Sequence, residues 1–224
     1  MKINNKKITF HSTNTELEIL NPVPSTKNVP SWYRKMPGVK DGIQTIKKCV
    51  PFLDSLSMGY HIPLPADFSW NNKEQKGFSN SKISIYSDHH LSQSEEVSIP
   101  PEFDPQPHKW SNHWYIKTPR GYSTLFIHPL NRMDLPFYSF SGVVDTDSHP
   151  LIINFPFVLR KDFDGVIKAG TPMIQAIPFK RDKWSSEVLD QFQSYTKDRL
   201  IGHEIMEPPF GWYKRKHWFR KEYR

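Results

Sequence analysis

Short apolar segments follow one another through the second half of the chain, and Pro, Gly and Asp residues separate them. Segments bounded by such turn-forming residues are typical of strands joined by tight connections. The pattern therefore predicts antiparallel strands rather than long helices. The strands predicted in this half are residues 114–117, 122–127, 141–144, 151–159, 165–168 and 173–179. Earlier candidates are residues 7–11, 17–20 and 82–86.

Two stretches place apolar residues at helical intervals. In residues 45–58, Pro51 suits the first turn of a helix, and Gly59 suits the position after the last turn, where a positive φ is common. Residues 185–200 carry a similar apolar stripe, and Ser185 can cap its first turn. We expect both helices to lie beside the sheets.

Proline is unusually frequent, with twenty residues against ten glycines. Because proline lacks the amide proton that a helix interior needs, this composition excludes a helical bundle and a coiled coil. We predict a single β-rich domain over residues 1–224, in which residues 203–224 form a basic aromatic C-terminal arm. The predicted fold class is mainly β: an antiparallel β-sandwich, or a β-clip or jelly-roll-like core, with one or two peripheral helices.

The positive charge of the chain gathers at its C-terminal end. The formal net charge is +7, and residues 212–224 contain six Lys or Arg residues and one Glu. The single cysteine, Cys49, excludes an internal disulfide and a cysteine-based zinc site. No apolar stretch reaches the length that crosses a bilayer, and residues 1–20 lack the apolar region of a signal peptide. We therefore expect neither a membrane partner nor secretion by a signal peptide.

The C-terminal arm interleaves cations with aromatic residues. Cations attract phosphates and aromatic rings stack on bases, so this segment suits nucleic acid. The same side chains could instead anchor the arm on a neighbouring subunit, since arms of this kind often hold assemblies together. Both alternatives stay open at this point. They share the same candidate residues, which are Lys214, Arg215, Lys216, Trp218, Arg220 and Lys221.

No metal site is predicted, and no cofactor. The chain has no HExxH, Gly-x-Ser-x-Gly or Walker pattern. The weak candidates for metal ligands are Asp145, Asp147 and His149, whose side chains would share one face if this segment were an extended strand. Scattered carboxylates and histidines of this kind are mostly surface residues.

Four segments occur in the order found in a known superfamily. They are residues 58–64 (Met-Gly-Tyr-His-Ile-Pro-Leu), 118–123 (Thr-Pro-Arg-Gly-Tyr-Ser), 141–147 (Ser-Gly-Val-Val-Asp-Thr-Asp) and 168–177 (Lys-Ala-Gly-Thr-Pro-Met-Ile-Gln-Ala-Ile). Through these segments, half of the chain resembles the dUTP pyrophosphatase and dCTP deaminase superfamily. The resemblance implies a β-clip type of fold and a (deoxy)nucleotide as ligand.

The same resemblance implies roles for individual residues. Asp145 would activate or position a water, and Mg²⁺ would be needed only in this nucleotide-binding interpretation. The residues that would bind the ligand are Arg120, Gly121, Tyr60 and Gln175. The sequence departs from the superfamily at Gly121, which replaces the serine of the phosphate loop, and in its C-terminal arm, which is not glycine-rich. From the residues alone, Asp145 can instead cap a β-turn.

Most of the chain resembles an uncharacterised family of tailed phages and bacteria. The matching segments include residues 30–33 (Pro-Ser-Trp-Tyr), 48–53 (Lys-Cys-Val-Pro-Phe-Leu), 118–122, 141–147 and 170–173 (Gly-Thr-Pro-Met). This family has no assigned activity, so the resemblance implies little about function. We predict a phage-type structural or binding protein without catalytic activity, in the host cytoplasm or the virion. Its partners would be a second copy of the chain, other phage proteins, or nucleic acid bound through the arm. The alternative is a (deoxy)nucleotide-binding or nucleotide-hydrolysing enzyme.

Overall fold

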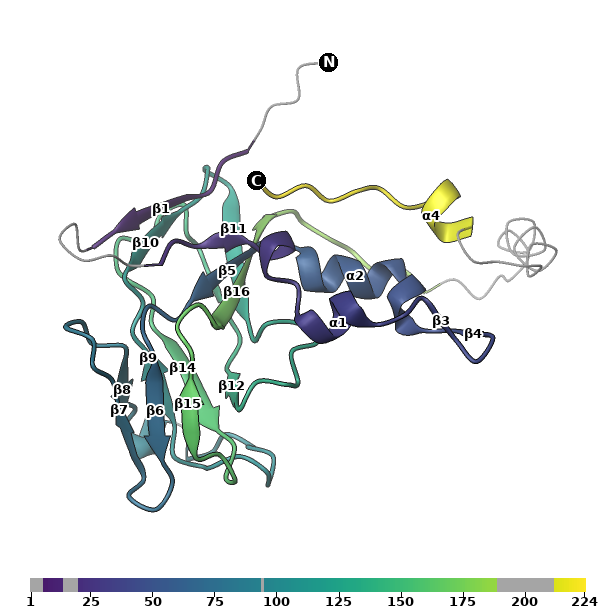
Figure 1. Ribbon diagram of the computed structural model, residues 1–224. Coiled ribbons are helices and arrows are strands. Elements are labelled where there is room, and N and C mark those ends of the chain that lie inside the picture. The colour runs from purple at the N-terminus through teal and green to yellow at the C-terminus, as the bar shows by residue number, and fades with distance from the viewer. Residues whose placement is uncertain (1–5, 14–19, 94, 189–211) are drawn as a thin grey trace. The chain divides into compact units, whose positions relative to one another are not determined.

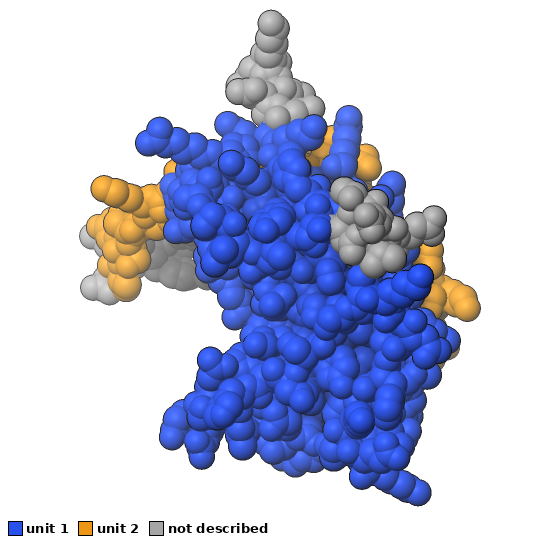
Figure 2. Space-filling view, turned by 90° about the vertical axis from the view of Figure 1, so that its left-hand side faces the viewer, with its two compact units in different colours: residues 1–30, 55–181, 223–224 blue, residues 31–54, 182–222 orange. Residues whose placement is uncertain are grey.

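The computed structural model describes residues 6–13, 20–93, 95–188 and 212–224 (Figure 1). These residues fall into two compact units, which Figure 2 distinguishes by colour. Unit 1 comprises residues 1–30, 55–181 and 223–224, and unit 2 comprises residues 31–54 and 182–222. Each unit is described separately below, and the single domain over residues 1–224 stays a prediction.

The largest sheet of unit 1 has five antiparallel strands, with β16 at its centre (Figure 1). In spatial order these strands are β13 (Gly142–Val144), β11 (Tyr122–Ile127), β16 (Pro172–Lys180), β5 (Tyr60–Pro63) and β2 (Val23–Pro24). The ladder between β11 and β16 runs from Tyr122, opposite Lys180, to Ile127, opposite Gln175. This six-pair ladder is the longest pairing among the described strands, so it sets the relative positions of the groups at its two ends.

The other sheets of unit 1 are smaller and also antiparallel. One has four strands, which are β12 (Phe137–Ser139), β14 (Phe155–Leu159), β9 (His108–Trp110) and β8 (Tyr86–Asp88). Another has three, which are β15 (Gly165–Ile167), β6 (Phe68–Asn71) and β7 (Lys76–Phe78). A two-stranded sheet pairs β1 (Thr9–Ser12) with β10 (Trp114–Lys117). Two short 3₁₀ turns, η1 (Ser25–Asn28) and η3 (Leu91–Gln93), lie between strands.

A cluster of aromatic rings fills the core of unit 1. Trp110 is fully buried and stacks on Phe157, with ring centroids 3.6 Å apart and planes 2° from parallel. Phe68 and Phe137 contact the same indole edge to face, at 5.3 and 5.2 Å. These rings come from four different strands of the four-stranded and three-stranded sheets, so one apolar cluster joins both. Aromatic pairs in such geometries add to the stability that comes from burying their area.

Unit 2 contains short elements from two distant parts of the sequence. The N-terminal part has α1 (Ser31–Lys35), a hairpin of β3 (Val39–Lys40) and β4 (Ile43–Gln44), and η2 (Ile46–Lys48). The C-terminal part has α4 (Trp212–Lys216). The helix α2 (Val50–Ser57) follows η2 and continues into the residues of unit 1. The hairpin turn uses Asp41 and Gly42, both with positive φ, as a type I′ turn requires.

The predicted fold class is confirmed: the chain is mainly β, with antiparallel sheets and few helices. The predicted helix 45–58 is shorter, because residues 46–48 form a 3₁₀ turn and α2 begins at Val50. The predicted strand 151–159 is regular only from Phe155, and the predicted strand 82–86 only begins at Tyr86. Within the predicted helix 185–200, residues 185–188 form no regular element and the rest lies outside the described residues. None of the described helices is long and apolar enough to cross a membrane.

Gly59 ends α2 as the sequence predicts, and its lack of a side chain is required by packing as well as by φ. Its φ is +71°, and a Cβ there would lie 2.3 Å from the carbonyl oxygen of Ala176 on β16. We expect Gly59→Ala to cost more than the roughly 1–2 kcal/mol of a left-handed alanine alone. The measurement is thermal unfolding followed by circular dichroism.

The matched control for this prediction is Gly170→Ala, also in unit 1. Gly170 has a φ of +85°, but the nearest atom to its Cβ would be a Leu20 methyl 3.9 Å away. In this variant alanine adopts the unfavourable left-handed conformation, but its Cβ meets no backbone atom. Its melting temperature should therefore be higher than that of Gly59→Ala. Equal melting temperatures for the two variants would contradict the steric argument.

Candidate functional site

The basic aromatic segment after α4 is tied to its own chain through one carboxylate in unit 2. Trp218 Nε1 donates a hydrogen bond to Asp54 Oδ2 at 2.9 Å, and Lys221 Nζ donates to the same oxygen at 2.6 Å. The Asp54 side chain is largely buried. Because the ionised carboxylate of Asp54 accepts both hydrogen bonds, it fixes the side chains of Trp218 and Lys221. Two of the residues predicted to bind a partner or nucleic acid therefore have a positioning contact within the chain.

A pocket of about 530 Å³ lies in unit 2, between this segment and the residues that open α2. Its cations are Lys47, Lys48 and Lys214, and its aromatic side chains are Tyr213 and Trp218. Lys214 Nζ lies 6.0 Å from the ring centroid of Trp218. Lys47 Nζ is fixed by the carbonyl oxygens of α1, through bonds of 2.6 and 3.0 Å. The pocket thus combines positive charge with aromatic surface, the combination that binds phosphate and base groups.

Two described segments of unit 2 carry a large excess of positive charge. Residues 31–54 and 212–222 together hold ten Lys or Arg and three Asp or Glu, a formal charge of +7 that equals that of the whole chain. Arg215 and Arg220 are exposed, and neither has an ion-pair partner among the residues that the structure describes. The side chain of Lys216 lies outside the described part. We call residues 31–54 and 212–222 the basic face.

A second polar cluster lies in unit 1, where Arg181 follows the last residue of β16. Arg181 Nη1 donates to Asp145 Oδ1 at 3.1 Å and to Asp147 Oδ1 at 2.9 Å, and Nη2 donates to Asp147 Oδ2. Ser123 Oγ donates to Asp145 Oδ1 at 2.5 Å, and the Gly121 amide donates to Asp147 Oδ2 at 2.8 Å. We call these five residues the Arg181 cluster.

The Arg181 cluster places Asp145 and Asp147 in a structural bond network. The guanidinium and the Gly121 amide lower the pKa of Asp147 from 3.8 to about 2, and Asp147 in turn raises the pKa of Arg181. Asp145 Oδ1 already accepts from Ser123 and Arg181. The low pKa makes the Asp147 carboxylate a weak base, so at this residue the geometry favours a fixed ion pair over water activation.

The segment around Asp147 is a turn and not the extended strand that the metal hypothesis assumed. The amides of Ser148 and His149 both donate to the carbonyl oxygen of Asp145, at 3.0 and 2.9 Å. Asp145, Asp147 and His149 therefore do not alternate along a strand. Within the described residues, no group of three His, Cys, Asp or Glu side chains could hold a metal ion.

The residues predicted to bind a nucleotide are divided between two ends of the β11–β16 ladder. Gly121 lies beside Asp147, at the end where Tyr122 pairs with Lys180, and Arg120 is exposed in the turn before β11. Gln175 pairs with Ile127, five residues further along β11, a distance of about 17 Å at the usual strand rise.

Gln175 and Tyr60 each have partners within unit 1. Gln175 is fully buried, with its Nε2 donating to the carbonyl oxygens of Ser55 and Met58 and its Oε1 accepting from the Leu130 amide at 2.9 Å. The Tyr60 hydroxyl donates to the carbonyl oxygen of Arg224 at 3.2 Å. These contacts place the Gln175 amide in the core, away from solvent.

Two positioning residues were not found from the sequence. Asp54 and Arg181 have no motif of their own, and their partners lie 164 and 34 positions away in the chain. The adjacent cations Lys47 and Lys48 could have been found, since they lie next to each other in the predicted helix 45–58. Comparisons with protein-family models, curated proteins and solved structures found no match to this chain.

The ion pair of Asp147 with Arg181 predicts a pH dependence of stability. The native pKa of Asp147 is about 2, below its ordinary value of 3.8. Its stabilising contribution is therefore complete above the ordinary pKa and is lost as the pH falls from about 4 to about 2. We expect Asp147→Asn to unfold at a lower temperature at neutral pH, and to lack this part of the acid dependence. Thermal unfolding from pH 2 to 7 measures both effects.

Two further variants separate charge from geometry. Arg181→Lys keeps the charge but loses the planar pair of donors. Its melting temperature at neutral pH should therefore lie between those of the native protein and Asp147→Asn. Asp145→Asn should have a smaller effect, because the Asp145 side chain is 63% exposed and that of Asp147 only 7%. An acid dependence in Asp147→Asn equal to that of the native protein would refute the assignment.

Proposed function

We propose that this chain is a phage-type binding protein without catalytic activity, and that its basic face engages single-stranded nucleic acid. One observation carries the proposal: the pocket in unit 2 brings Lys48 and Lys214 next to two aromatic side chains, in a region of net charge +7. The phage-type part of the proposal follows the resemblance to a family of tailed phages and bacteria, which has no assigned activity. The preference for nucleic acid over a partner chain rests on the charge.

Charge gives the basic face its affinity for a phosphate backbone. A protein that neutralises phosphates releases their condensed counterions, so binding becomes strong at low salt and weak at high salt. Arg215 and Arg220 are exposed and have no ion-pair partner within the described residues, so their guanidinium groups are available for phosphates. Lys221, by contrast, is engaged by Asp54 and positions the segment.

Aromatic side chains supply the second part of the interaction. Phe219 is 82% exposed, and Tyr213 also presents its ring to solvent. A phenylalanine exposed to this extent has no packing role in the described unit, whereas every nucleobase offers a flat surface on which it can stack. The hydrogen bond between Trp218 and Asp54 holds the adjacent residues in one orientation, which lowers the entropy lost on binding.

The arrangement in unit 1 supports the non-catalytic interpretation over a nucleotide-hydrolysing enzyme. Asp145 is bonded to Arg181 and Ser123, and the buried Gln175 lies about 17 Å from the Gly121 end of the ladder. General base catalysis needs a carboxylate within reach of the attacking water, together with groups close by that bind the same substrate.

The test is fluorescence anisotropy with a labelled oligothymidylate over a range of salt concentrations. In the variant with Lys214, Arg215 and Arg220 all changed to Ala, we expect weaker binding. The slope of log K against log salt should also fall by about 2, because each phosphate contact to a single strand contributes about 0.7. Phe219→Ala should weaken binding by about 1–3 kcal/mol without changing the slope.

The matched control changes three exposed lysines of unit 1, Lys73, Lys82 and Lys117, to Ala. It removes the same charge from the protein, so it should keep both affinity and slope if the basic face is the binding site. Equal losses in the two triple variants would contradict a defined site. If the oligonucleotide does not bind and deletion of residues 212–224 changes the mass in light scattering, a partner chain replaces nucleic acid as the ligand.

A further inference from the structure

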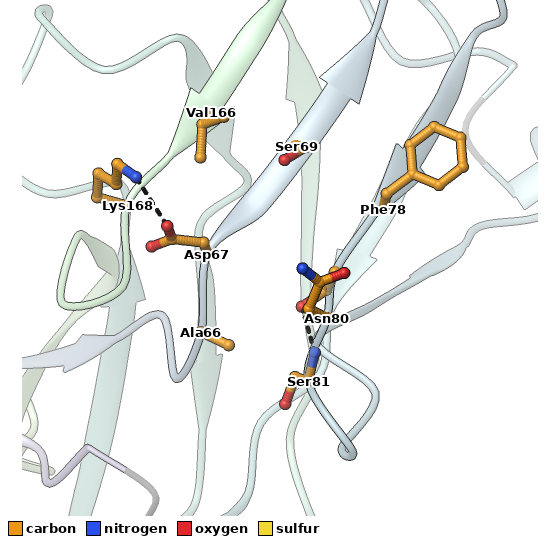
Figure 3. A pocket seen from close by; sticks show the side chains of 9 residues that line it. Ala66, Asp67, Ser69, Phe78, Asn80, Ser81, Val166 and Lys168 are labelled. Carbon is orange, nitrogen blue, oxygen red and sulfur yellow. Dashed lines mark hydrogen bonds and ion pairs between the residues drawn. The ribbon is translucent and has the colours of Figure 1, made fainter.

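A second pocket, of about 380 Å³, lies on the exposed side of the three-stranded sheet of unit 1 (Figure 3). Val166, Ser69 and Phe78 form a row across its strands β15, β6 and β7, as the pairings of Val166 with Ser69 and of Ser69 with Phe78 require. Asp67 and Lys168 lie at one end of the row, and Asn80 belongs to the chain that follows β7.

The sheet beneath this pocket is rigid because its other side belongs to the core. Phe68, Trp70 and Ile167 alternate with the pocket residues and are almost completely buried. A binding surface on strands whose opposite face is packed is held in its working geometry before a ligand arrives. The pocket is therefore preorganised, although it is open to solvent.

Two polar side chains of the pocket are without a hydrogen-bond partner in the part of the chain that the structure describes. The hydroxyl of Ser69 and the side-chain amide of Asn80 make no hydrogen bond with any described residue. Between them they offer hydrogen-bond donors and acceptors in a small area. Ligands that satisfy such a set carry groups that both donate and accept, as hydroxyl groups do.

The charges of the pocket cancel each other. Lys168 Nζ donates to Asp67 Oδ2 at 2.8 Å, and the Ala169 amide donates to Asp67 Oδ1 at 2.8 Å (Figure 3). The hydrogen bonds from the Lys168 ammonium and the Ala169 amide lower the pKa of Asp67, and the ion pair of Asp67 with Lys168 carries no net charge. This ion pair itself adds no net attraction for a phosphate or for a free amino group.

The apolar part of the pocket is aromatic. Phe78 is 43% exposed, with Lys76 Nζ 5.5 Å from its ring centroid. Val166 and Ala66 extend the apolar surface on the other strands and the preceding turn. A flat apolar surface beside unpaired polar groups matches a ligand that has an apolar ring face and a polar edge.

We propose that this pocket binds a neutral carbohydrate, with one sugar ring against Phe78 and its hydroxyl groups on Ser69, Asn80 and Asp67. A pyranose has C–H groups on its faces and hydroxyl groups around its edge, so it fits both halves of the surface. The neutral ion pair disfavours a nucleotide at this place, in contrast to the basic face. The volume of the pocket lies at the small end of ligand sites and suits one or two rings. This site is independent of the proposed function.

The experiment is saturation-transfer NMR of the full chain with the methyl glycosides of glucose, galactose, mannose and N-acetylglucosamine. Each glycoside is used at about 10 mM, above the millimolar Kd expected of a small open site. We expect transfer to the ring protons of at least one glycoside. In Phe78→Ala and in Asn80→Leu, the Kd obtained by titrating the glycoside should rise about fivefold or more, the effect of losing an anchor worth over 1 kcal/mol.

The control is Tyr115→Ala, since Tyr115 is another strand residue that is 43% exposed but lies outside the pocket. It should keep the signal of the native protein, and its melting temperature and those of the pocket variants are compared to exclude unfolding. No transfer to any of the glycosides would overturn the proposal. A glycoside Kd that stays unchanged in both pocket variants would also overturn it. So would adenosine monophosphate giving a signal as strong as that of the glycosides, if the pocket substitutions abolish that signal as well.

Discussion

The pairing of β11 with β16 is the constraint on which the polar groups of unit 1 depend. Its register places Lys180 opposite Tyr122, so that Arg181, the next residue, meets Asp145 and Asp147 after β13. At the other end of the same ladder, Gln175 meets the last carbonyl groups of α2. A shift of one residue would turn every side chain of β16 to the opposite face and would separate both sets of partners.

The cations of this protein have two roles, and only the contacts distinguish them. Arg181 and Lys221 each bind a carboxylate of their own unit, and Lys47 binds carbonyl oxygens of α1. These groups hold segments in place. Arg215 and Arg220 have no such partner among the described residues, which leaves their charge for an external ligand. The net charge of +7 therefore does not say which cations are free, because it sums paired and unpaired groups alike.

The sequence predicted local structure better than it predicted contacts. The strand β11 and the helix end at Gly59 follow from patterns within a few residues. The strand predicted over residues 151–159 begins only at Phe155. Leu151 is apolar but 66% exposed, and no described strand pairs with it. Gln175 had the same appearance in the sequence as a ligand-binding amide. Its burial depends on β5 and β11 lying on both sides of β16, which no local pattern records.

The two proposed sites depend on different physical interactions, and this difference allows each site to be tested independently of the other. The basic face attracts an anionic polymer through charge, so its affinity must follow ionic strength. The pocket beside Phe78 holds its only ion pair neutral, so a ligand bound there releases no counterions and its affinity must be almost independent of salt. The sites also lie in separate units, defined by their own contacts. Salt-independent binding at the basic face, or strongly salt-dependent binding in the pocket beside Phe78, would therefore show that the site is wrongly assigned, whatever the affinity.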